Sequence, residues 1–248
     1  MDIISIPRIL SKLDNYFEKN DYKGAESHLV NWLREAKQIQ DKKLELCITN
    51  ELVGLYRKLN REPEGLRAIR DALNLVYNMK ITDNIGAGTT YLNCATAYQA
   101  FNMYENALRL FEMALEVYEK ELSPTDQRRG GLYNNMGLTL VSMKRYGEAY
   151  HYYAKAIDIM SEQNLWLEVA MTYLNIANAK EAEYGLVQAE EAIEFLLEKA
   201  AKLIDAYEDR GGYYAFVCEK CASVYGYYGW FVYKNKLLKR AEKIYAGT

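Results

Sequence analysis

Hydrophobic residues along this chain form pairs of stripes, and within each stripe they recur every three to four residues. In the segment 91–115, one stripe ends at a turn around Phe101 and Asn102, and a second stripe begins directly after it. The same pattern returns 42 residues later, where Ala149 takes the place of Ala107. This spacing places each stripe on one face of a helix, so the pattern predicts a repeated helical hairpin.

Six such hairpins become visible when they are aligned on one residue, usually a small one, in the first turn of the second helix. The aligned residues are Ala25, Gly65, Ala107, Ala149, either Ala189 or Ala192, and Lys234. Their near-constant spacing falls in the range of about 20–50 residues that is typical of solenoids. We therefore expect an all-α fold, an α-solenoid of about six helix-turn-helix units.

The expected units cover residues 6–40, 44–80, 87–121, 127–161, 165–207 and 211–246. No shift in composition marks a domain boundary, which predicts a single array over residues 1–248. In the fifth unit we expect a longer, less regular turn near Tyr184 and Gly185. The last helix, expected at 235–246, has one apolar side and one basic side, as a helix that caps the end of an array requires.

The third and fourth units carry the most regular pattern. The third has Tyr91, Cys94, Ala95, Tyr98, Tyr104, Ala107, Phe111, Ala114 and Leu115, and the fourth has Tyr133, Met136, Gly137, Leu140, Tyr146, Ala149, Tyr153, Ala156 and Ile157. In these residues the chain resembles the tetratricopeptide repeat family, in the longer form seen in kinesin light chain. The resemblance implies a right-handed superhelix of hairpins whose first helices line a concave groove. The last two units depart from the pattern, because Leu186 and Phe231 replace a tyrosine and Lys234 replaces the small residue.

The resemblance also indicates which side chains face the groove. Asn93, Asn135 and Asn175 would form a row of amides able to bind the N–H and C=O groups of an extended peptide. Asn134 and Asn178 add further amides, and Thr96, Gln99 and Leu138 would contribute to the floor. Alternatively, the asparagines bond to neighbouring helices and hold the repeats together; both roles can coexist.

Other candidate sites are weaker. Arg128 could pair with an acidic group of a ligand, or it could lie in a solvated loop. Cys218 and Cys221 resemble half of a metal or redox site, but without a second pair we interpret them as buried packing residues. We expect no catalytic constellation, no metal and no cofactor. The aromatic run 225–233 either closes the end of the stack or forms a patch through which two copies form a homodimer.

Composition narrows the partners. The formal net charge is −3 and no basic block is present, so nucleic-acid binding is not expected. No segment is long and apolar enough to span a membrane, and the N-terminus lacks the features of a signal peptide. We expect a cytoplasmic protein that is not an enzyme and that binds a protein or an extended peptide as a scaffold. The alternative is a peptide-sensing regulator of the Gram-positive bacterial, quorum-sensing type that lacks its effector domain.

Overall fold

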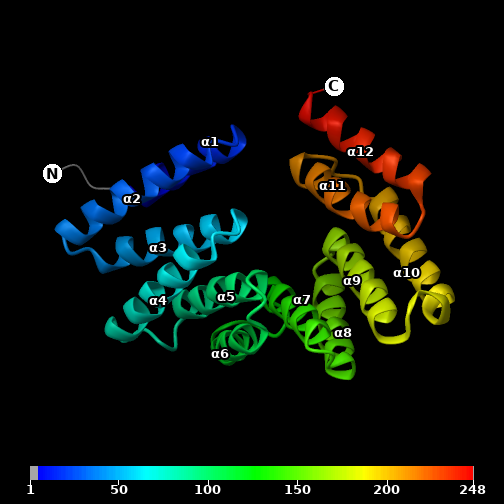
Figure 1. Cartoon of the computed structure of the whole chain (residues 1–248), viewed down its shortest axis with the longest axis horizontal. Helices are drawn as coiled ribbons and strands as arrows, with labels where there is room; N and C mark the ends of the chain where they lie inside the picture. Colours follow the sequence, from blue (N-terminus) through cyan, green and yellow to red (C-terminus); the bar gives the residue numbers. More distant parts are fainter. Residues whose placement is uncertain (1–4, 248) are drawn as a thin grey trace. The chain divides into compact units, whose positions relative to one another are not determined.

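The computed structural model describes residues 5–247, and all regular secondary structure within them is helical (Figure 1). The helices are α1 (Ile6–Glu18), α2 (Tyr22–Gln38), α3 (Lys42–Lys58), α4 (Glu62–Asn78), α5 (Ile85–Ala100), α6 (Tyr104–Glu121), α7 (Gln127–Ser142), α8 (Tyr146–Glu162), α9 (Trp166–Tyr184), α10 (Leu186–Ala206), α11 (Gly212–Tyr227) and α12 (Phe231–Tyr245). Consecutive pairs form the six predicted hairpins, and the all-α solenoid-type fold is confirmed.

The chain divides into two compact units, Met1–Glu121 and Leu122–Thr248. The first contains the hairpins from α1 to α6, and the second contains those from α7 to α12. A single array over the whole chain stays a prediction.

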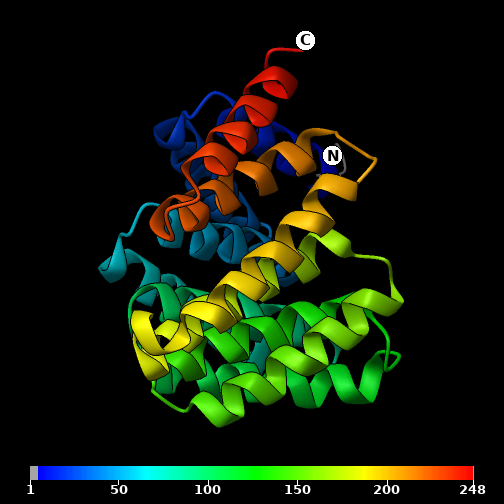
Figure 2. The same cartoon turned by 90° about the vertical axis from the view of Figure 1, so that its right-hand side faces the viewer.

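In the second unit the first helices of successive hairpins lie side by side. Both α7 and α11 contact α9, and α8 packs against α9 (Figures 1 and 2). The helices α7, α9 and α11 therefore form one wall, with their second helices α8, α10 and α12 behind them.

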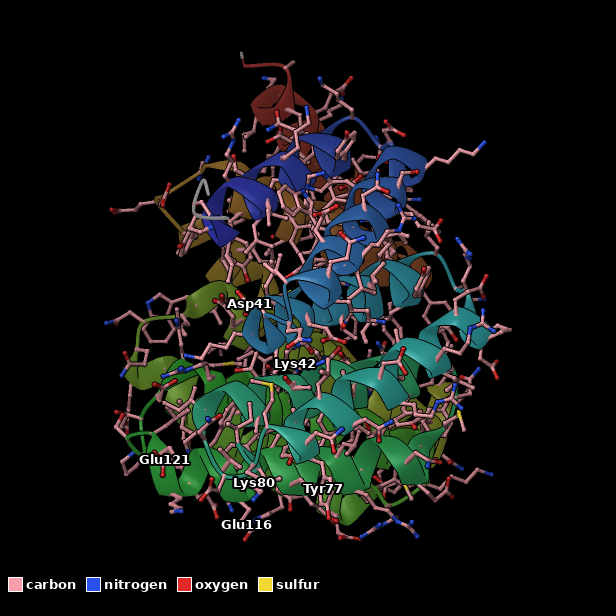
Figure 3. The ribbon with its side chains drawn as sticks, turned by 90° about the vertical axis from the view of Figure 1, so that its left-hand side faces the viewer. Asp41, Lys42, Tyr77, Lys80, Glu116 and Glu121 are labelled. Carbon is pink, nitrogen blue, oxygen red and sulfur yellow. The ribbon has the colours of Figure 1, made fainter. Side chains whose placement is uncertain are left out.

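The first unit repeats this arrangement. Here α3 packs against α2 and α5 packs against α4, while α3 also contacts α5. Figure 3 labels Asp41 and Lys42 where α3 begins; the Asp41 carboxylate caps this helix by accepting hydrogen bonds from the backbone N–H groups of Lys43 and Leu44, at 3.1 and 3.0 Å. Lys80, also labelled, occupies the turn after α4.

Each hairpin closes through one residue with a left-handed backbone. These residues are Asn20, Asn60, Asn102, Lys144, Gly185 and Gly229, with φ between 52° and 82°. Asparagine and glycine adopt this conformation at low cost, and it ends a helix by turning the chain back. Gly185 alone joins α9 to α10, so the prediction of a longer turn there was wrong.

The small residues lie where the two helices of a hairpin approach closely. Ala25, Ala107 and Ala149 are fully buried. In the fifth hairpin Ala189 is buried and Ala192 is exposed, which settles the register that the sequence left open.

The last hairpin accommodates its lysine differently. A Cβ atom at Gly226 would lie 2.7 Å from Cδ of Lys234, so the glycine leaves room for the lysine stem. The helix itself begins at Phe231, earlier than the predicted residue 235.

Two polar pairs link neighbouring hairpins. Asn50 Nδ2 donates to Thr90 Oγ1 at 3.0 Å in the first unit, and Thr172 Oγ1 lies 3.1 Å from Asn134 Oδ1 in the second. Both threonines are fully buried. By repeat register these two pairs occupy equivalent positions, so an Asn–Thr hydrogen bond recurs there, donated by the asparagine in the first unit and by the threonine in the second.

Candidate functional site

A groove opens on the wall formed by α7, α9 and α11, with a cavity volume of about 570 Å³. It is lined by Gly131, Asn134, Asn135, Leu138, Met160, Glu168, Met171, Thr172, Leu174, Asn175, Phe216, Lys220, Cys221 and Val224. Four of the predicted residues are therefore brought together here, namely Asn134, Asn135, Leu138 and Asn175.

The floor of the groove is apolar. Met160, Leu174 and Cys221 are buried beneath it, whereas Phe216 at the edge is 43% exposed. A floor of this kind favours the burial of an apolar side chain from a bound partner, at about 25 cal/mol per Å² of apolar surface removed from water.

Amides form the polar part of the groove. Asn175 Nδ2 donates to Asn134 Oδ1 at 3.0 Å, and the Thr172 hydroxyl lies within reach of both Asn134 Oδ1 and the Glu168 carbonyl, the latter at 2.9 Å. Asn134 Nδ2 and Asn175 Oδ1 have no partner among residues 5–247. The cluster thus offers one donor and one acceptor, which is what a peptide group requires.

Two charged residues of opposite sign line the groove. Tyr213 OH donates to Glu168 Oε1 at 2.8 Å, and burial together with this carboxylate raises the pKa of Tyr213. Lys220 Nζ lies 5.6 Å from the centre of the Phe216 ring. The groove therefore carries both an anion and a cation beside its apolar floor.

Asn178 lies in a smaller hollow of about 380 Å³, lined also by Glu181, Ser223, Val224 and Tyr227. Tyr228 OH donates to Asn178 Oδ1 at 3.0 Å. Since Val224 lines both hollows, Asn178 belongs to the edge of the groove and already has a protein partner.

Asn93, Thr96 and Gln99 lie on α5 in the first unit and are all half-buried. Thr96 Oγ1 accepts a hydrogen bond from Arg57 Nη1 at 2.7 Å and donates to the Asn93 carbonyl at 2.9 Å. A row of amides running from Asn93 to Asn135 and Asn175 stays a prediction.

Arg128 does not line the groove. Its guanidinium binds the carboxylate of Asp126, with Nε at 2.9 Å and Nη2 at 2.7 Å. Asp126 caps α7 by accepting from the backbone N–H of Arg128. Arg128 lowers the pKa of Asp126 to about 2, so this arginine stabilises the start of a helix.

Three of the four cysteines, Cys94, Cys218 and Cys221, are buried, and Cys47 is half-buried. All four are free thiols, and burial raises the pKa of Cys221 to about 12. No group of three or more potential metal ligands occurs among residues 5–247.

The aromatic run divides between packing and exposure. Tyr225 is fully buried, with its ring 4.6 Å from that of Tyr233 in an edge-to-face contact. Trp230 Nε1 donates to Glu194 Oε2 at 3.0 Å. Tyr227 and Phe231 are more than half exposed. Packing thus accounts for part of the run, and a homodimer stays a prediction.

The sequence reasoning missed the residues that α11 contributes to the groove, above all Phe216 and Lys220. The sixth hairpin departs from the repeat pattern, so the inward positions of its first helix were not assigned. Aligning α11 on Cys218, which is buried as Tyr91 and Tyr133 are, would have found them.

The family model for the tetratricopeptide repeat matches residues 44–120, which cover the second and third hairpins. Residues 44–120 therefore match the tetratricopeptide repeat family, and the remaining hairpins are likewise pairs of consecutive helices. Among curated proteins, none matches this chain in sequence.

Three solved structures show how far the fold extends along this chain. BtubC (BKLC) from P. vanneervenii is 20% identical, with a TM-score of 0.69 and 82% of each chain covered. A putative kinesin light chain from Podosopora anserina with nearly identical TPR-like repeats is 16% identical, with a TM-score of 0.55, covering 80% of this chain and 94% of that one. The apo form of RapI is 12% identical, with a TM-score of 0.62, covering 96% of this chain and 82% of that one. At these identities the likeness establishes the fold alone.

Among residues 5–247, none of the helices combines the length and apolar character required to cross a membrane.

Proposed function

We propose that this protein is a non-enzymatic, cytoplasmic scaffold that binds an extended segment of another protein in the groove of its second unit. The fold of the tetratricopeptide repeat family suggests a scaffold for protein interactions, and the groove suggests how a peptide would bind to it. The observation that carries the proposal is the pairing of Asn134 with Asn175, which leaves one amide donor and one acceptor open above an apolar floor. An extended peptide would satisfy both amides through its main chain and bury alternate side chains below.

Substitution of Asn135 by alanine tests this proposal. Asn135 lines the groove and is half-buried, so its loss should weaken binding of an extended peptide about tenfold, which corresponds to about 1.4 kcal/mol. Binding is measured by fluorescence anisotropy with peptides selected from a random library on the wild-type protein. Asn74→Ala, at an exposed position on α4, is the matched control.

Thermal melting distinguishes a role in binding from a role in folding. The proposal requires Asn135→Ala to melt close to the wild type while its affinity falls. Equal affinity in both variants, or a melting point that collapses in Asn135→Ala, contradicts it. Phe216→Ala, at the exposed edge of the apolar floor, provides a second variant that should weaken binding without disturbing the amides.

A peptide-sensing regulator is the second candidate. Glu168 and Lys220 place opposite charges in one groove, which suits a short free peptide whose two termini are charged. The likeness to RapI over 96% of this chain is compatible with it. The two candidates are distinguished by measuring the affinity for one peptide in three forms: with free termini, with blocked termini, and inserted in a loop of a carrier protein. A sensor binds only the form with free termini. A scaffold binds all three forms.

A further inference from the structure

Two glutamates lie at the two ends of the groove along α9. Glu168 lines the groove itself, and Glu181 lines the smaller hollow that shares Val224 with it. We call the groove and this hollow together the long groove. The two glutamates are thirteen positions apart in one helix, and a rise of about 1.5 Å per residue places them about 20 Å apart. The long groove therefore has a carboxylate at each end.

Tyrosines at the two ends of α11, which packs beside α9 (Figure 1), hold both carboxylates in place. Tyr213 OH donates to Glu168 Oε1 at 2.8 Å. Tyr227 OH donates to Glu181 Oε1 at 2.6 Å, and Tyr228 OH donates to Glu181 Oε2 at 2.9 Å. A phenol is a neutral donor, so these hydrogen bonds orient the carboxylates without neutralising their charge.

Neither carboxylate is paired with a lysine or an arginine among residues 5–247. In the first unit the half-buried carboxylate of Glu26 has such a counterion, because Arg61 Nη1 lies 2.6 Å from its Oε2. Glu168 and Glu181 are half-buried as well, so a cation supplied by a ligand would be stabilised at each of them. The long groove thus has two positions for positively charged groups.

The stretch between the two carboxylates is apolar. Met171 and Leu174 of α9 line it on one side, and Val224 of α11 lines it on the other. An extended segment rises about 3.3 Å per residue and directs alternate side chains to the same face. A segment that spans about 20 Å therefore reaches from one carboxylate to the other with two side chains six positions apart. The two side chains between them on that face meet the apolar floor.

Lys220 limits what the middle of such a segment can carry. It is the one cation among the residues found to line the two hollows, and it lies seven positions from Tyr213 and seven from Tyr227 along α11. Because like charges repel, Lys220 disfavours a basic side chain on the floor between the two ends. The long groove therefore favours separated basic residues over a continuous basic run.

We propose that the long groove binds an extended dibasic segment of a partner protein. Two arginines or lysines of that segment, six positions apart, pair with Glu168 and Glu181, and two apolar side chains between them lie on the floor. This inference rests on the proposed function, because it names the kind of segment that the groove holds.

Peptides with blocked termini test the proposal with the full chain. The probe has arginines at its first and seventh positions, leucines at its third and fifth, and serines elsewhere. Two matched peptides carry glutamines or glutamates in place of both arginines, and a third carries lysines in place of both leucines. In fluorescence anisotropy the arginine peptide should bind about tenfold more tightly than the glutamine peptide, and added salt should reduce this difference. The glutamate peptide and the lysine-substituted peptide should both bind more weakly than the arginine peptide.

Conservative variants of the protein separate charge from packing. Glu168→Gln and Glu181→Gln keep an oxygen that accepts the tyrosine hydrogen bonds but remove the negative charge. Each should weaken binding of the arginine peptide about threefold and leave binding of the glutamine peptide unchanged. Glu183→Gln is the matched control, because Glu183 is half-buried on the same helix, accepts from Tyr150 OH at 2.6 Å and is not among the residues that line either hollow. It should bind both peptides as the wild type does.

The inference is overturned if the arginine and glutamine peptides bind equally, if the glutamate peptide binds most tightly, or if Glu183→Gln weakens binding as much as Glu168→Gln does. If the leucines set the affinity and the arginines do not, the groove binds peptides as proposed and only this inference fails. If neither these peptides nor library-selected ones bind at about 1 mM, the proposed function fails with it.

Discussion

Asn134 and Asn175 share a hydrogen bond of 3.0 Å although they are 41 residues apart in the chain. Because they lie on α7 and α9, this bond ties two neighbouring first helices together at the surface that would receive a ligand. Both asparagines also line the groove. In the proposed function, this single pair therefore serves both repeat packing and recognition.

Asn134→Ala should lower the free energy of unfolding by about 1 kcal/mol, because it removes the acceptor of Asn175 Nδ2, whereas the buried Thr172 hydroxyl keeps the Glu168 carbonyl as its acceptor. Urea denaturation followed by circular dichroism measures the change. Asn74→Ala, at an exposed position, should stay within about 0.5 kcal/mol of the wild type. If the urea midpoint of Asn134→Ala equals that of the control, the hydrogen bond between Asn134 and Asn175 does not stabilise the packing of α7 against α9.

Gly137→Ala should destabilise the fourth hairpin. The added Cβ would lie 2.5 Å from Cε1 of Tyr153, and this ring is fully buried and has no room to move. Overpacking of this kind costs about 1–3 kcal/mol, which exceeds the gain of about 1 kcal/mol expected from replacing a helical glycine.

The matched control is Gly147→Ala, where no atom lies within 4 Å of the new Cβ. It should leave the melting temperature unchanged or raise it slightly. Calorimetry measures the melting temperatures of Gly137→Ala and Gly147→Ala. Equal values would mean that the Tyr153 ring moves to make room for the added methyl group.

Arg128→Ala should change the acid stability of the second unit. The pKa of Asp126 is lowered to about 2 from its ordinary value of 3.8, mainly by Arg128. A carboxyl whose pKa is lowered by folding stabilises the protein above its unfolded pKa, and this contribution is lost as the pH falls through the folded value. Without Arg128 the folded pKa rises toward 3.8, so this contribution becomes smaller and less stability is lost on acidification.

An NMR titration of the Asp126 carboxyl carbon from about pH 5 to about pH 2 measures this shift directly. Peptide binding in the groove should remain as in the wild type, because Arg128 is not among the lining residues. An unchanged Asp126 titration would contradict the assigned pairing, and weakened peptide binding would restore Arg128 to the site.

Thiol reagents should distinguish the four cysteines. Cys47 is half-buried, whereas Cys94, Cys218 and Cys221 are buried, and burial raises the pKa of Cys94 and of Cys221 to about 12. In the native protein at mildly alkaline pH, Cys47 should react first and the other three should react at the rate of unfolding. A colorimetric thiol assay with and without urea measures this, and Cys47→Ser should abolish the early phase. Fast reaction of Cys218 or Cys221 would reveal an accessible thiol pair.

The sequence predicted the hairpins well because their signals are local. Asparagines at 20, 60 and 102 mark turns through their own backbone preference, and buried alanines recur where helices meet. The fifth and sixth hairpins were harder, since Gly185 closes its turn alone and Gly226 rather than an alanine makes room for Lys234. The Gly185 turn and the packing of Lys234 on Gly226 depend on tertiary contacts, which a repeat pattern in the sequence does not reveal.

The groove was only partly predictable for the same reason. Repeat spacing placed Asn134, Asn135 and Asn175 on inward faces, but the direction of each amide depends on its neighbour across the helix pair. The sequence suggested that Arg128 could bind a ligand, but its guanidinium binds Asp126, the residue that caps α7. Residues that act through tertiary partners cannot be assigned from spacing alone.

The junctions between successive hairpins alternate between apolar and polar pairs at one repeat position. The second and fourth junctions are polar seams, where Asn50 bonds with Thr90 and Asn134 bonds with Thr172. The first and last junctions have apolar residues at the same positions, Leu10 with Ile48 and Leu174 with Val217. Deleting one hairpin, such as residues 85–126, would set Asn50 against Leu132 and leave its half-buried amide nitrogen without the Thr90 acceptor. Deleting two would set Asn50 against Thr172 and restore a match. Gene duplication or loss in this lineage should therefore preserve an even number of hairpins between the polar seams.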